Sequence, residues 1–172
     1  LFPSPEVVGS LAAEQRDELV AALVRNIALG PADVADYCKE RMSLLAVSAA
    51  DLQTLLESTG FATPVAASKG KKKARARSVA DAAEQRRILE AVLQVALSTI
   101  SAAKEAGPLP AAEFGGGALM STFYAVLQGL LRDADGLGAD SLDFARQIGL
   151  QVVTLATGIV ADAAAGGDAP KP

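Results

Sequence analysis

The organisation of this chain follows from residues 78–107, which read SVADAAEQRRILEAVLQVALSTISAAKEAG. A Ser-x-x-Asp pattern at Ser78 predicts the start of a helix, and Gly107 followed by Pro108 predicts its end. The apolar residues between them cover well over a third of the helix circumference: Ile88, Leu89, Val92, Leu93, Val95, Ala96, Leu97 and Ile100. A surface helix has a narrower apolar stripe, so we expect this long helix to pack against neighbours on more than one side.

The composition of the 172 residues predicts an all-α protein. Hydrophobic residues make up 51% of the chain but aromatic residues only 4%, and Ala, Leu and Val suit close helix–helix contacts. Runs of alternating β-branched and aromatic residues are missing, so we expect no strand. We predict a single helical domain over residues 1–172, a compact bundle of five to six helices with a long basic flexible loop between the third and fourth main helices.

Apolar periodicity and capping residues place the other helices. They are expected at about 12–29, 31–46, 48–60, 118–134 and 141–164. Helices on both sides of the basic loop should share one core, because the first three alone would make a thin one.

Three local features complete this prediction. The second helix is expected to bury an apolar stripe formed by Val34, Tyr37, Cys38, Met42 and Leu45. Residues 135–138, Asp-Gly-Leu-Gly, are expected to form a turn, with Asp140 and Asp143 capping the last helix. We expect residues 165–172 to form a disordered tail.

The strongest charge feature is a basic tract at residues 69–77. It carries six positive charges and no negative ones, whereas the rest of the chain holds ten Lys or Arg against twenty Asp or Glu, a net charge of −10. Repulsion within the tract predicts a flexible loop over residues 62–77. Its candidate contacts for a polyanion or a partner are Lys69, Lys71, Lys72, Lys73, Arg75 and Arg77. A solvated loop that only separates apolar helices is the competing interpretation, since no aromatic residue is present to stack on bases.

The residue inventory argues against catalysis. The chain has no histidine, and Cys38 is its single cysteine, so imidazole chemistry, an internal disulfide and a thiolate metal cluster are all excluded. Cys38 lies on the apolar stripe of the second helix and is best interpreted as a buried small hydrophobe. We predict no catalytic, cofactor-binding or metal-binding residues, and therefore no enzyme.

Membrane insertion is not expected either. The longest uncharged stretch, 114–131, contains several glycines and polar residues that a lipid-facing helix would use sparingly. A buried helix of a soluble protein fits it better, so we predict no transmembrane span. We also see no secretory signal and predict an intracellular protein.

The leading functional hypothesis is a non-enzymatic helical protein-interaction or scaffold module. One version of this hypothesis is that the chain is a subunit of a larger assembly. Its partner would be another protein or copies of the same chain, and its positive support is the apolar surplus of the fourth and sixth helices. One alternative is a nucleic-acid or nuclear-associated protein that uses the basic loop 69–77. A second alternative is a carrier of a small apolar ligand between helices, which the low aromatic content disfavours.

Overall fold

The computed structural model describes residues 7, 10–43, 45, 47–62, 79–107, 114, 117–137 and 139–166. These residues form six helices and no strand, which confirms the all-α prediction. The helices are α2 (Ala13–Leu29), α3 (Ala32–Ser43), α4 (Ala49–Ser58), α5 (Val79–Ala106), α6 (Gly117–Leu137) and α7 (Ala139–Gly166).

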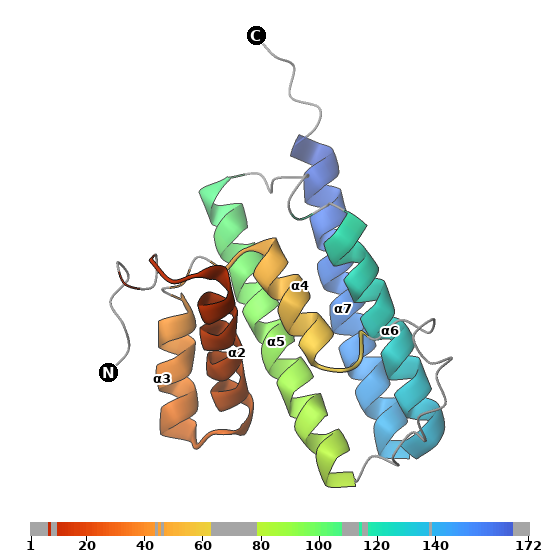
Figure 1. Cartoon of the computed structure of the whole chain (residues 1–172). Helices are drawn as coiled ribbons and strands as arrows, with labels where there is room; N and C mark the ends of the chain where they lie inside the picture. The colour runs from red at the N-terminus through yellow and green to blue at the C-terminus, as the bar shows by residue number, and fades with distance from the viewer. Residues whose placement is uncertain are drawn as a thin grey trace.

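Helix α5 occupies the middle of the bundle (Figure 1). The antiparallel pair α2 and α3 lies on one side of it and contacts it mainly through α2. The antiparallel hairpin of α6 and α7 lies on the other side, and α4 packs across α5 and α6. The expectation that the long helix packs on more than one side is therefore confirmed.

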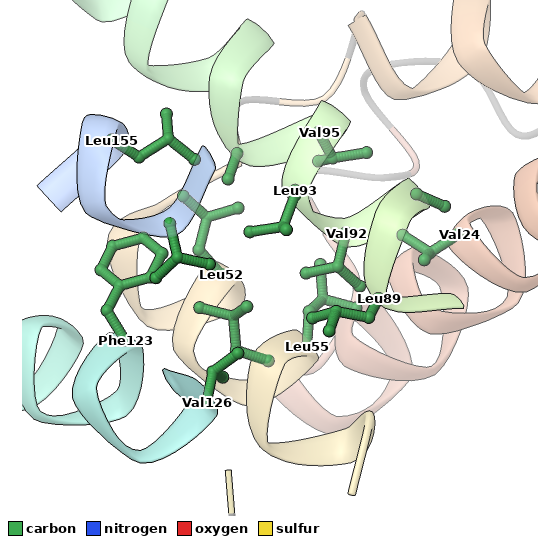
Figure 2. Close-up of a cluster of buried hydrophobic side chains, with 14 of the residues drawn as sticks. Val24, Leu52, Leu55, Leu89, Val92, Leu93, Val95, Phe123, Val126 and Leu155 are labelled. Atoms are coloured by element: carbon green, nitrogen blue, oxygen red, sulfur yellow. The ribbon is translucent and has the colours of Figure 1, made fainter. Parts of the chain in front are cut away.

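One continuous cluster of buried apolar side chains joins all six helices. Figure 2 shows how its members converge from different helices, with Val24 of α2, Leu52 of α4, Leu93 of α5, Phe123 of α6 and Leu155 of α7 among them. Helices from both sides of residues 63–78 thus share one core, as expected. On α5 most of the predicted apolar face is buried, but Leu97 is exposed.

The start of α4 follows its predicted capping pattern. The Ser48 Oγ accepts a hydrogen bond from the Asp51 backbone N–H at 3.2 Å, and Asp51 Oδ2 accepts one from the Ser48 N–H at 2.8 Å. The same carboxylate oxygen accepts a bond from Arg16 Nη2 of α2 at 3.3 Å. Gly60, with φ of 78°, ends the helix in the left-handed conformation that glycine adopts most easily. Asp51 therefore caps α4 and also connects it to α2 through the ion pair with Arg16.

We expect Asp51→Ala to lower the free energy of unfolding by about 2 kcal/mol, because it removes a cap and leaves Arg16 without this acceptor. Urea denaturation followed by circular dichroism measures the change. Asp17→Ala is the matched control, since Asp17 is exposed on α2 and its loss should change stability by less than about 0.5 kcal/mol. Equal losses in the two variants would contradict the role given to Asp51.

Helix α3 corrects one part of the sequence prediction. It ends at Ser43 instead of residue 46, and it buries Cys38 and Met42 as expected but leaves Val34 and Tyr37 exposed. The reason is that α3 packs against α2 and touches α5 only lightly, so a single narrow face is covered. The Tyr37 ring instead lies beside the Arg41 guanidinium, 4.9 Å from its centre.

The predicted turn at 135–138 is also wrong. Helix α6 continues to Leu137 and α7 begins at Ala139, so Asp135 and Gly136 are helical and only residue 138 separates the two helices. Asp140 and Asp143 accordingly lie within the first turns of α7. A glycine inside a helix costs roughly 1 kcal/mol, which the extended packing of α6 along α7 outweighs here.

The predicted disordered tail, residues 165–172, is described only in part. Residues 165 and 166 of the expected tail belong to α7, and residues 167–172 lie outside the described part of the chain.

Candidate functional site

The sequence-predicted contact residues cannot be placed in the fold. Lys69, Lys71, Lys72, Lys73, Arg75 and Arg77 all lie within residues 63–78, outside the described residues. Of the expected loop only residue 62 is described, and Ala62 is buried. Binding of a polyanion through this tract stays a prediction.

The described residues hold no group of three or more His, Cys, Asp or Glu side chains that could bind a metal ion. Cys38 is buried, as its place on the apolar stripe predicted. The expectation of no catalytic, cofactor or metal site stays a prediction, because part of the chain is not described.

A surface of exposed apolar side chains on α6 and α7 is the feature that stands out instead. Among the described residues ten large hydrophobic side chains are exposed, and six of them belong to these two helices. They are Tyr124, Leu131, Leu142, Leu150, Val153 and Val160. Single exposed apolar residues are normal on any protein, but a concentration on two adjacent helices is not.

Helical spacing groups most of these side chains on one face of each helix, and Leu150 also lines a hollow between α5 and α7. Tyr124 and Leu131 are seven residues apart on α6, and Val153 and Val160 are seven apart on α7, a separation that returns to the same helix face. Helices α6 and α7 pack closely, since a Cβ added to Gly149 would lie 3.7 Å from Leu127 Cδ2. We call this surface, made by the six residues listed above, the outer hairpin face.

Two hydroxyl groups of α7 near the outer hairpin face already donate hydrogen bonds within the helix. Thr154 Oγ1 donates to the Leu150 carbonyl at 2.8 Å, and Thr157 Oγ1 donates to the Val153 carbonyl at 2.8 Å. Residues 147–161 carry no charge. Covering this part of α7 would therefore remove neither a charge nor an unpaired hydroxyl from water.

Helix α7 as a whole is unusually apolar for its position. Its segment Leu142–Asp162 has a mean hydropathy of 1.3 over an 18-residue window, and only 22% of that window is buried. By length and composition it is the one helix in the described residues that could cross a membrane, although core helices of soluble proteins meet the same criterion. The prediction of no transmembrane span rests on residues 114–131, and it stays a prediction.

Two hollows flank α5. One, of about 710 Å³, lies between α5 and α7, with Leu93, Ile100, Ile148 and Leu155 among its apolar lining residues. It is bordered at the C-terminal ends of both helices by an ion pair of Lys104 Nζ and Asp162 Oδ2 at 2.5 Å. The other, of about 590 Å³, lies between α3 and α5 and is lined by Met42, Val95 and Phe114 among others. Space for a small apolar ligand between helices therefore exists.

Periodicity alone separates two sets of apolar residues on α7, but it cannot show which set the neighbouring helices cover. The residues that α7 buries, Ile148, Val152, Leu155 and Ile159, form one stripe, and Leu142, Val153 and Val160 lie to one side of it.

Comparison of the chain with protein-family models, with curated proteins and with solved structures finds no match.

Proposed function

We propose that this protein is a non-enzymatic helical interaction module and that the outer hairpin face is its contact surface. The observation that carries the proposal is the concentration of six of the ten exposed large hydrophobic side chains on α6 and α7. Contiguous apolar surface on a soluble domain is typical of a site that another molecule covers.

Burial of this face by a partner is energetically favoured over its exposure to water. Fully burying a Leu- or Val-sized side chain contributes about 1.5–3 kcal/mol, and the side chains of this face are roughly half covered or less in the isolated chain. Tyr124 adds a large ring with a polar end, a residue type that often dominates binding at interfaces. The face therefore offers a substantial gain to a partner of matching shape.

The chemistry of the face suits a protein partner. Its centre is uncharged, while Arg132, Asp143 and Arg146 are exposed at the end of the hairpin where Leu131 and Leu142 lie. An apolar centre with charged residues at its edge is the usual arrangement of a protein–protein interface.

Tyr124→Lys is expected to reduce retention of partner proteins from a source lysate by about tenfold or more, because it places a charge in the centre of the face. The measurement is a pull-down with the immobilised full chain, with the retained proteins identified by mass spectrometry. Tyr37→Lys is the matched control: the chain has two tyrosines, and Tyr37 is exposed (43%, against 62% for Tyr124) on α3, away from the hairpin.

The control should retain the same proteins as the wild type. Both variants should keep the helical circular dichroism spectrum, since both tyrosines are on the surface. Unchanged retention in Tyr124→Lys would contradict the proposal.

The hollows beside α5 support one second candidate, a carrier of a small apolar ligand. Their walls combine apolar with polar residues, and their volumes of about 590 and 710 Å³ are within the range of ligand pockets. Native mass spectrometry separates this candidate from the first, because a carried molecule adds a constant mass to the purified chain.

A further inference from the structure

We propose that the partner covering the outer hairpin face is a second copy of this chain. The two α6–α7 hairpins then pack face to face, as two layers of two helices each. This inference rests on the proposed function, which makes the same face an interface. It adds the identity of the partner and the symmetry of the contact: a two-fold interface in which the same surface meets itself.

The width of the face favours a hairpin as the partner. The exposed side chains come from two antiparallel helices, Tyr124 and Leu131 from α6 and the other four from α7. A single partner helix has one apolar stripe and would cover the seam or one helix, leaving part of the face in water. A second hairpin presents two stripes at the same seven-residue spacing, which allows the side chains of one copy to fit between those of the other.

The charge distribution permits self-contact despite the acidic chain. The whole chain has a net charge of −4, so two copies repel each other only weakly at long range. The central part of α7, residues 147–161, carries no charge, so a copy placed against it meets no like charge at close range. Among the residues whose burial is described, the exposed charges at the end of the hairpin are of both signs, Arg132 and Arg146 with Asp143, and the sequence there also contains Asp133, Asp135 and Asp140.

The same charges disfavour a bilayer as the occupant. A helix that lies on a membrane normally carries many Lys and Arg on its polar face, which attract anionic lipids. Helix α7 carries Arg146 as its single basic residue, together with several acidic ones.

The available area is close to what a stable dimer needs. Each of the six side chains exposes on the order of 100 Å² of apolar surface, which gives about 600 Å² per copy. A specific interface buries about 800 Å² on each partner. Thr154, Thr157 and the neighbouring parts of both helices supply the remainder, and their hydroxyls already have acceptors within the helix.

The wild-type full chain is expected to sediment as a monomer–dimer equilibrium in the micromolar range. Val153→Lys should weaken association by about tenfold or more, because each copy would bring a charge into the contact. Val34→Lys is the matched control, since Val34 is exposed on α3 to a similar extent, 37% against 44% for Val153. The control should associate as the wild type does, and both variants should keep the wild-type urea midpoint.

Cross-linking provides a second measurement that does not depend on weakening the contact. The one native cysteine, Cys38, is buried, so Val153→Cys adds a single accessible thiol. A short thiol–thiol cross-linker should then link two copies in high yield, whereas the Val34→Cys variant should stay monomeric on a denaturing gel.

A wild type that remains monomeric across the micromolar range would overturn the dimer, as would a dimer that Val153→Lys leaves intact. A monomer that floats with anionic phosphatidylserine vesicles would assign the face to a membrane and overturn it too. If the dimer fails but the pull-down still depends on Tyr124, the proposed function stands with a different protein partner. If neither measurement depends on the face, both proposals fail.

Discussion

Replacing Gly129 with alanine is expected to lower the free energy of unfolding by about 3 kcal/mol or more, the upper end for overpacking a core. Gly129 is buried in α6, where it meets the backbone that follows α4. A Cβ at this position would lie 2.0 Å from the Phe61 carbonyl oxygen and 2.8 Å from its carbon. Because both atoms belong to the backbone, no side-chain rotation relieves the clash, and α4 and α6 must move apart.

Gly149→Ala is the control for this prediction. Gly149 is also helical, but its added Cβ would make an ordinary 3.7 Å contact with Leu127 Cδ2. Alanine is favoured over glycine inside a helix by about 1 kcal/mol, so this variant should be neutral or slightly more stable than the wild type. Urea denaturation of both variants gives the comparison. Similar midpoints would mean that α6 does not approach residue 61 as closely as the structure shows.

Leu93→Ala is expected to destabilise the fold by about 2–5 kcal/mol, the usual cost of truncating a buried leucine. Leu93 lies on α5 within the cluster of Figure 2, near side chains from α4, α6 and α7. Its loss therefore weakens the contact of the central helix with several others. The urea midpoint and slope of the transition measure the effect.

The matched variant on the same helix is Leu97→Ala. Leu97 belonged to the same predicted apolar face, but its side chain is exposed, so its truncation should cost less than about 1 kcal/mol. An unchanged midpoint for Leu93→Ala, or equal losses in the two variants, would show that the orientation of α5 is wrong.

The sequence predicts well those features that depend on neighbouring residues. Gly107 ends α5, the Ser48–Asp51 pattern caps α4, and Gly60 terminates it, all as local capping preferences require. The core stripe of α5 also follows from helical periodicity, because six of its eight predicted residues are buried.

Features that depend on how many neighbours a helix has are not predictable in this way. Periodicity identifies an apolar face on α3 but cannot show that only α2 covers it, which leaves Val34 and Tyr37 exposed. Asp135 and Gly136 have turn preferences, yet packing of α6 along α7 keeps them helical. Likewise the apolar residues of α7 are compatible with a core or an interface, and only the fold shows that Val153 and Val160 are uncovered.

The candidate sites from sequence and from structure are therefore different. Charge alone identified the basic tract 69–77, which lies outside the described residues. The outer hairpin face carries no such charge signal, and its residues are of the same types as those of the core.

The long-range contacts at the two ends of α4 have a consequence for the order in which the helices fold. A ten-residue helix is marginal in water on its own, so α4 gains most of its stability only when it docks. Its start is fixed by Arg16, thirty-five residues earlier in the chain than Asp51, and the backbone just beyond its end rests on Gly129. The α2–α3 and α6–α7 pairs are closed by short connections and can form early, whereas both contacts of α4 require distant segments to meet. Docking of α4 is therefore expected to come late, as the step that joins two preformed helix pairs through the central helix.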